Sequence, residues 1–292
     1  MKSRNFNTRL YLMYLLALVP LIAFGWYKNG LHLYERGLIN FYEMLRPLII
    51  LLSSILGSFL GGFLREWKKG SKLDRQVLNK LKGDIVEATL VGAMLSVDSN
   101  FLVVFAVAFI FSLSFSKVNV NKVALIYLVI FGINALLGLN TFQNVYQANT
   151  ALNYDGYDLF FGSGAGGIFS TNVFLILLAM GFLSANKLYK KETVFTASLV
   201  FIILSVITNV ISNNYLGILP YIFGYNFLFV FVFVAPNLYS SSYTTKGQIV
   251  SGILIAVLTF ALSFVIPYAS ATIAVLVISA LKGVLDRIFV IK

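Results

Sequence analysis

The amino-acid sequence predicts an all-α polytopic membrane protein with about ten transmembrane helices in two inverted five-helix repeats. The first observation is composition, because 59% of the residues are hydrophobic and 11% are charged, whereas a soluble globular domain is about half apolar and a quarter charged. The second is the length of the apolar runs, most of which approach the roughly 20 residues that cross a bilayer. The third is the placement of lysine and arginine, which gather in alternate connectors.

Apolar runs divide the chain into about ten expected membrane spans. Polar or charged residues flank most of these runs, and the run between Asp84 and Asp98 is the shortest. In order along the chain, the expected spans are residues 9–26, 45–64, 85–97, 100–117, 121–139, 167–185, 194–213, 217–235, 247–266 and 268–285.

The basic residues support this number of spans. If the N-terminus is cytoplasmic, 19 of the 22 Lys and Arg residues fall on the cytoplasmic side, and only Lys28, Arg36 and Arg46 fall outside. A missing or additional span would scramble this bias, so we predict a multi-pass protein of the cytoplasmic membrane with both termini in the cytoplasm. Orientation and attraction to membrane lipid account for the net charge of +11, so nucleic acid is not an expected partner. The densest basic run, from Arg65 to Lys82, is expected to be a solvated cytoplasmic loop; the alternative is that the loop includes a short amphipathic helix lying on the membrane.

Two pairs of similar runs suggest that the halves arose by duplication. Residues 101–115 resemble residues 252–264, and residues 123–138 resemble residues 272–285. Because five spans is an odd number, the second copy must enter the membrane from the opposite side. The alternative is that apolar sequences of low complexity resemble one another by chance. The predicted division is a first five-helix repeat over 1–139, an outer-face loop with a candidate binding site over 140–166, and a second five-helix repeat over 167–292.

The third span of each half is expected to be irregular. In inverted repeats, short or interrupted helices at equivalent positions often mark a binding site near the membrane midplane. The span 85–97 is short, and its counterpart 217–235 carries Pro220 and Gly224 near its start. Glu87 would lie in the first turn of the short span, where the helix dipole favours a carboxylate; the alternative is an ion or proton ligand.

Cysteine and histidine usage excludes several kinds of redox or metal centre. The chain has no cysteine, which excludes disulfides, thiolate-held iron–sulfur clusters and cysteine nucleophiles from this subunit. A single His32 in a hydrophilic connector does not suffice for haem or zinc, which need imidazole or thiolate ligands. Any redox chemistry would therefore depend on an organic cofactor.

The longest polar interval of the second half covers residues 144–172. It contains no Lys or Arg and passes through a glycine cluster into the next apolar run, and long loops commonly carry function. Glycines before a helix leave backbone N–H groups available to an anion, with Ser163, Ser170 and Thr171 as hydroxyl donors near Gly166. The alternative is that these small residues allow close helix packing.

Two segments of the C-terminal half carry motifs that resemble a known family. Residues 158–183 read DLFFGSGAGGIFSTNVFLILLAMGFL and are similar to DLFLGxxPGSIGETSxLAxLxGGxxL. Residues 235–287 begin APNLYSSSYTTKGQIVSG and are similar to a segment beginning ATDPVTSPxTxKGxxIYG. These patterns are those of the NqrB/RnfD family, the flavin-carrying membrane subunits of the sodium-pumping NADH:quinone oxidoreductase and of the Rnf ferredoxin:NAD oxidoreductase. The first half resembles the family in span count and apolar pattern.

The resemblance implies a covalent flavin in the outer loop. In that family a threonine within DxxSGATPL carries FMN through a phosphoester bond. The matching residues 144–152 read NVYQANTAL, so Thr150 takes the flavinylated position and Leu152 is kept, while the other motif residues differ. The glycine cluster and its neighbouring hydroxyl residues would then contribute to the flavin site.

The resemblance also implies a second cofactor on the inner face. The family's TDPVTSP corresponds to residues 236–242, in which the aspartate becomes Asn237. If this loop helps to hold a noncovalent flavin, such as riboflavin, we expect Asn237, Ser240 and Thr244 to bind it.

The function implied is that of a membrane subunit of an Rnf/Nqr-like ion-translocating electron transport complex that relays electrons through bound flavin. Its partners would include an outer flavoprotein and iron–sulfur subunits, and coupling to sodium or proton movement is implied in the same way. The alternative is a cofactor-free relative that acts as a small-solute transporter or membrane scaffold, because fold does not imply function. A polysaccharide polymerase or lipid-modifying enzyme fits less well. Such enzymes usually need several Arg, His or acidic residues on the outer face, and the outer face of this chain has few of them.

Overall fold

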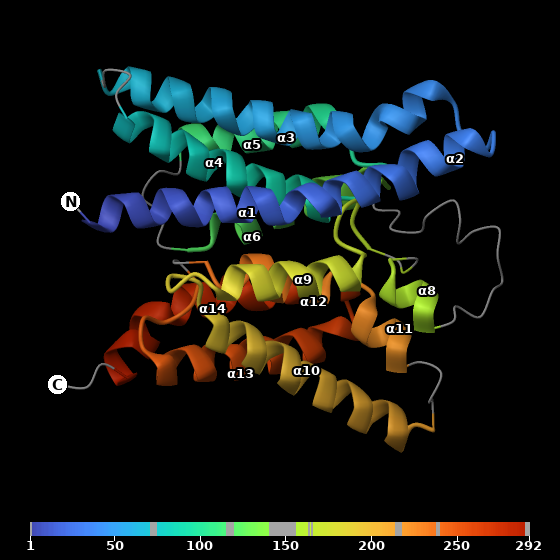
Figure 1. Ribbon diagram of the computed structural model, residues 1–292, viewed down its shortest axis with the longest axis vertical. Helices are drawn as coiled ribbons and strands as arrows, with labels where there is room; N and C mark the ends of the chain where they lie inside the picture. Colours follow the sequence, from blue (N-terminus) through green and yellow to red (C-terminus); the bar gives the residue numbers. More distant parts are fainter. Residues whose placement is uncertain are drawn as a thin grey trace. The chain divides into compact units, whose positions relative to one another are not determined.

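A computed structural model gives the fold of most of the chain. It describes residues 2–70, 75–114, 120–139, 156–162, 164, 166–213, 218–237 and 240–289, and the regular structure of these residues is entirely helical (Figure 1). The helical segments long and apolar enough to cross a membrane are Arg9–Glu35, Phe41–Lys68, Lys191–Ile211, Thr245–Ser263 and Pro267–Phe289, and shorter apolar helices are Phe101–Ser114, Lys122–Leu136 and Val173–Ser184.

These helices confirm the predicted all-α polytopic membrane class. Each of the ten expected spans overlaps a helical segment of the described residues. The chain folds as two compact units. The first comprises Met1–Val118, Ile126–Thr150 and Gly167–Phe169, and the second comprises Asn119–Leu125, Ala151–Gly166 and Ser170–Lys292.

The first unit is built around α3. A capping box fixes the start of this helix, because Glu43 N donates to Asn40 Oδ1 and Asn40 N donates to Glu43 Oε2, both at 2.9 Å. From there α3 packs along α5 and against α4, as Figure 1 shows. The helices of this part are α1 (Lys2–Trp26), η1 (Tyr27–Leu31), α2 (His32–Glu35), α3 (Phe41–Lys68), α4 (Arg75–Met94), α5 (Phe101–Ser114) and α6 (Lys122–Leu136), whose first residues are counted with the second unit.

Glycine brings α3 and α5 into close contact. A Cβ at Gly57 would collide with the carbonyl oxygen of Phe105, and a Cβ at Gly61 would collide with that of Phe109. Two glycines four residues apart on one helix face let the backbones of membrane helices approach. The packing of α3 on α5 therefore depends on these missing side chains.

The structure corrects the prediction around the third span of the first half. The helix α4 begins at Arg75 rather than near residue 85, so the short apolar run is the second half of a 20-residue helix, and Glu87 lies well inside the helix rather than in its first turn. The helix α3 continues to Lys68, and Arg65 is buried, with 7% of its surface exposed. The described part of the run from Arg65 to Lys82 is thus largely helical, with Arg65 and Glu66 buried in ion pairs and Lys68, Lys69 and Lys80 exposed.

The second unit is built around α13, which packs on both α10 and α14. Thr244 caps α13 by accepting a hydrogen bond from Gly247 N at 3.2 Å. A Cβ at Gly252 would lie 2.8 Å from the carbonyl oxygen of Thr193, so α13 also uses a glycine to approach α10. The helices of this unit are α8 (Gly156–Phe160), α9 (Val173–Ser184), α10 (Lys191–Ile211), α11 (Ile218–Phe223), α12 (Phe227–Phe229), η3 (Val230–Val234), α13 (Thr245–Ser263) and α14 (Pro267–Phe289).

The two units share an internal packing arrangement. In the first unit the second predicted span, α3, packs along the fourth, α5, and in the second unit the second span, α10, packs along the fourth, α13. If the fold is duplicated, helices at the same position in the two halves should pack against the same neighbours. This agreement supports the duplication, while the inverted orientation and the exact repeat boundaries stay predictions.

The third span of the second half is interrupted, as predicted. The helix α11 ends at Phe223, and Tyr225 and Asn226 then take left-handed conformations with φ of 58° and 68°. The chain resumes as α12 and the π-helix η3. Non-helical backbone at membrane depth is tolerated where protein buries it, and Asn226 is only 4% exposed.

Candidate functional site

The helix break in the second unit lies against the predicted anion site of the outer loop. Ser170 Oγ donates a hydrogen bond to Asn226 Oδ1. A Cβ at Gly166 would lie 2.8 Å from both Asn226 Oδ1 and Thr171 Cγ2. The structure therefore brings three predicted site residues, Gly166, Ser170 and Thr171, together around one asparagine side chain.

The start of α9 is closed by its own cap. Asn172 Oδ1 accepts from Leu175 N at 2.9 Å, and Asn172 Nδ2 donates to the carbonyl of Phe161 at 2.9 Å. Ser170, Thr171 and Asn172 are each less than 5% exposed. The hydroxyl of Ser170 and one amide of the first turn are thus engaged within the protein, as the packing alternative expects, and a ligand role of these residues stays a prediction.

Gly167 has a separate packing role in the first unit. Its Cα meets the backbone of Met94, because a Cβ there would lie 2.5 Å from the Met94 carbonyl oxygen. The next residues donate to carbonyls at the end of α4, from Ile168 N to Leu95 O at 2.9 Å and from Phe169 N to Ala93 O at 3.0 Å. Asn29 Nδ2 also donates to the carbonyl of Ile168, at 2.8 Å. This glycine is needed for close backbone contact.

The inner-face loop of the second unit is a buried serine cluster. Ser240, Ser241 and Ser242 are all 0% exposed. Asn121 Nδ2 donates to Ser240 Oγ and to the carbonyl of Val234, the latter at 2.9 Å. Asn121 N donates to Ser279 Oγ at 3.1 Å. Ser240 therefore fixes Asn121 between this loop and α14.

The remaining predicted residues of this loop lie at its two ends. Thr244 acts as the N-cap of α13, and Asn237 N donates to the carbonyl of Val234 at 3.3 Å. Ser242 Oγ donates to Asp286 Oδ1 at 2.5 Å. These contacts hold the loop against α13 and α14.

Two predicted site residues lie outside the described part of the chain. They are Thr150, the expected flavin attachment residue, and Ser163. Their roles stay predictions.

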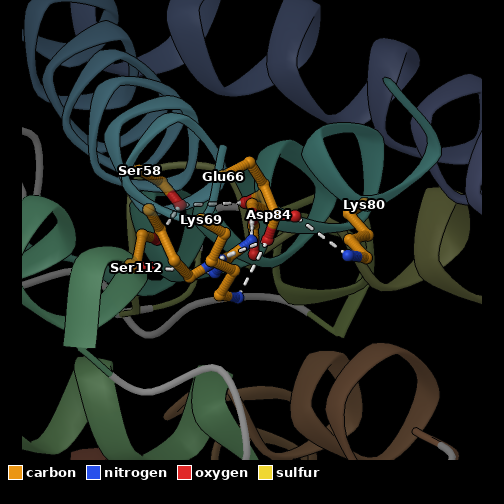
Figure 2. A network of polar contacts seen from close by, with 7 residues as sticks. Ser58, Glu66, Lys69, Lys80, Asp84 and Ser112 are labelled. Atoms are coloured by element: carbon orange, nitrogen blue, oxygen red, sulfur yellow. Dashed lines mark hydrogen bonds and ion pairs between the residues drawn. The ribbon is translucent and has the colours of Figure 1, made fainter. Parts of the chain in front are cut away.

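A network of charged side chains joins α3, α4 and α5 in the first unit (Figure 2). Arg65 lies at its centre and donates through Nη2 to Asp84 Oδ2 at 2.9 Å, through Nη1 to the carbonyl of Ser112 at 2.8 Å and through Nε to Glu66 Oε1 at 3.1 Å. Figure 2 shows Glu66 reaching Lys69 and Lys80, at 3.3 and 2.9 Å.

Hydroxyl groups extend this network along α3. Ser58 Oγ donates to the carbonyl of Asp84 at 3.2 Å and lies 2.6 Å from Ser112 Oγ. Ser54 Oγ donates to the carbonyl of Ala88 at 2.8 Å. Buried charges are costly unless they are paired and hydrogen-bonded, so this network fixes which faces of α3, α4 and α5 meet.

A second ion pair ties the other end of α3 to the segment after α4. Arg46 Nη1 lies 3.3 Å from Asp98 Oδ1, and Arg46 Nη2 donates to the Asp98 carbonyl at 3.0 Å. Burial raises the pKa of Asp98, Arg46 opposes this rise, and Glu43 adds to it. Both side chains are partly exposed, so the pair is of the weak, solvent-screened kind.

Sequence reasoning missed the Arg65 network and the Asn226 contact. The predicted span begins at residue 85 and therefore leaves Asp84 outside the membrane segment. Continuing the helix back to Arg75 would have placed Asp84 inside it, three residues before Glu87. No sequence signal pairs Ser170 with Asn226, which lie 56 residues apart.

Comparison with known proteins gives the family. A search of the curated proteins found no match. The family model described as the NQR2, RnfD, RnfE family matches residues 1–292. Since the match covers the whole chain and the chain is a multi-pass helical membrane protein, this protein belongs to the NQR2, RnfD, RnfE family.

Proposed function

We propose that this chain carries FMN on Thr150 and relays electrons within an ion-translocating membrane complex. Its family consists of membrane subunits of Rnf- and Nqr-type electron transport complexes. The match over residues 1–292 carries the proposal, because it extends through the outer loop that contains Thr150. A phosphoester attachment requires one threonine hydroxyl, which Thr150 supplies. The flavin would provide the redox chemistry, and the protein would hold and orient it.

The described residues do not fit a second flavin at the predicted inner-face positions. The Ser240 hydroxyl holds Asn121, and Ser240 is fully buried. Thr244 caps α13 through its hydroxyl. Releasing either contact would leave a buried polar group unsatisfied, at a cost of about 1–3 kcal/mol. We therefore propose only the covalent flavin.

Partners of this subunit follow from the family. Its relatives work in multi-subunit membrane complexes, and we propose an outer flavoprotein and iron–sulfur subunits as electron-transfer partners of this chain. The chain itself has no cysteine, so iron–sulfur clusters would be held elsewhere in the complex. The positive-inside bias supports a cytoplasmic-membrane location with both termini inside.

The test is in-gel flavin fluorescence and intact mass of the denatured protein, expressed in cells that have a flavin transferase. The wild type should show an adduct of the mass of FMN less water, and Thr150→Ala should lose it. Thr141→Ala, at another threonine of the outer-face loop predicted over 140–166, is the matched control and should keep the adduct. An adduct that persists in Thr150→Ala would refute the attachment site.

A wild type without any adduct, and without flavin released from the native protein, would refute the redox proposal. The cofactor-free transporter or scaffold would then be the better description. The internally satisfied hydroxyls of Ser170 and Ser240 favour that second candidate. Solute flux in vesicles would be the measurement that supports it.

A further inference from the structure

A cluster of basic residues surrounds an exposed tyrosine at the end of the second unit where α10 and α13 begin and α14 ends. Tyr243 is 69% exposed, although the three serines before it are fully buried. Lys190 Nζ lies 4.8 Å from the centroid of the Tyr243 ring, and Lys282 Nζ lies 4.1 Å from the same centroid. We propose that Lys190 and Lys282, together with Tyr243, bind the phosphate group of an anionic membrane lipid.

The first support is the position of Lys190. This residue is 5% exposed, and its ammonium group donates to the backbone carbonyl of Ser241. Among the described residues Lys190 forms no ion pair, so a carbonyl and an aromatic ring are what compensate its charge. A buried ammonium is costly without a counter-charge. Burial, with Lys282 adding to the effect and Asp286 opposing it, lowers the pKa of Lys190 to about 7.

The second support is the local balance of charge. The carboxylate of Asp286, which acts electrostatically on Lys190, already accepts from Ser242 Oγ at 2.5 Å and from Tyr243 N at 3.1 Å. Basic residues outnumber acidic residues at this end of the unit. The described basic residues there are Lys122, Lys187, Lys190, Lys191, Lys246, Lys282 and Arg287, and the acidic ones are Glu192 and Asp286.

The third support is depth in the membrane, which selects a lipid as the source of the phosphate. Tyr243 lies between η3, which ends at Val234, and α13, which begins at Thr245. Exposed tyrosines at the ends of membrane spans lie at the level of the lipid headgroups. Basic pockets between membrane helices on the cytoplasmic side bind anionic headgroups, and the positive-inside bias assigns this end to the cytoplasm. A phosphate next to Tyr243 would supply a negative charge to the buried Lys190.

Lipid binding at this cluster is independent of electron transfer, so it is tested on the full chain by a measurement that does not depend on bound flavin. The unfolding temperature of the protein in neutral detergent is measured during titration with phosphatidylglycerol, with phosphatidylcholine or with inorganic phosphate. Phosphatidylglycerol should raise the unfolding temperature more than phosphatidylcholine does. The double variant Lys190→Gln/Lys282→Gln should need on the order of a hundredfold more phosphatidylglycerol for the same rise, because each lysine loses a direct charge-assisted hydrogen bond to the phosphate.

The matched control is Lys187→Gln/Lys191→Gln, which removes the same charge from two exposed lysines of the same end. It should respond as the wild type does. If the first double variant does not fold, the single variant Lys282→Gln carries the test, with an expected loss of about tenfold from one charge-assisted hydrogen bond.

Three results would overturn the proposal. The first is an equal loss in the control, which would indicate general attraction to the surface. The second is an equal response to phosphatidylcholine, which would exclude selection of an anionic lipid. The third is a full response to inorganic phosphate alone, which would assign the cluster to a free anion.

Discussion

Replacing Arg65 by Met should destabilise the protein strongly. Arg65 and Asp84 pair at 2.9 Å with side chains that are each 7% exposed. Removing one member of such a buried pair leaves the other charge uncompensated, at a cost of about 3–5 kcal/mol. The carbonyl of Ser112 would also lose its donor.

A second substitution separates the charge effect from lost packing. Arg65→Met/Asp84→Asn removes the stranded carboxylate and keeps its shape, so the double variant should recover a large part of the loss. Glu66 still pairs with Lys69 and Lys80 in both variants. The control is Lys68→Met, an exposed lysine on the same helical turn, which should change stability by no more than about 0.5 kcal/mol.

The assay is unfolding in mixed micelles of neutral detergent and dodecyl sulfate. Tryptophan fluorescence reports it, since the chain has 2 tryptophans and Trp67 follows Glu66 directly. The reasoning is refuted if Arg65→Met costs no more than Lys68→Met. It is also refuted if the double variant is no more stable than Arg65→Met, because the stranded Asp84 charge would then not be the cause.

The same unfolding assay checks three further predictions. Gly61→Val should cost about 1–3 kcal/mol through overpacking against α5, whereas Gly132→Val should cost less, because a Cβ at Gly132 meets nothing within 4 Å. Asn226→Ala should cost about 1 kcal/mol more than Asn226→Gly, because both lose the contact with Ser170 and only alanine resists the left-handed backbone. Between pH 7 and 10.5 the unfolded chain holds the Lys190 proton and the folded chain does not, so the stability of the wild type relative to Lys190→Met should rise with pH in that window and level off below it.

Contrary results are equally specific. Equal costs at positions 61 and 132 would show that α3 and α5 are not in backbone contact. Equal stability of the two Asn226 variants would show that residue 226 does not adopt the left-handed backbone conformation. A stability difference for Lys190→Met that is constant from about pH 6 to about pH 10 would mean that the folded state does not perturb this lysine.

The sequence by itself determined the class of the protein and the order of its helices. A membrane span must satisfy its backbone locally and present about 20 apolar residues to the hydrocarbon core, so its existence depends on its own composition. For this reason each expected span overlaps a helix. Pro220 and Gly224 likewise predicted the interruption of the helix after α11. The family motifs of the C-terminal half were also readable without coordinates, and the whole-chain family match agrees with them.

Span ends were predicted less well. The start of α4 was placed about ten residues late, because its first turns are rich in charge and resemble a solvated loop. Arg65 forms ion pairs with Glu66 of the same helix and with Asp84 of α4. These pairs compensate the buried charges, so both helices can contain charged residues inside the protein. Hydropathy reports how strongly a segment prefers lipid over water. It contains no information about an ion-pair partner on another helix.

Only the tertiary structure decided what the polar residues of the candidate site contact. Ser170 pairs with Asn226, and Ser240 pairs with Asn121, 119 residues away. Each hydroxyl looked equally suited to a ligand in the sequence, because a side chain's partner depends on which helix faces pack together. Helix formation in a membrane is a local property of the chain, whereas the pairing of buried polar groups is settled only when the helices assemble.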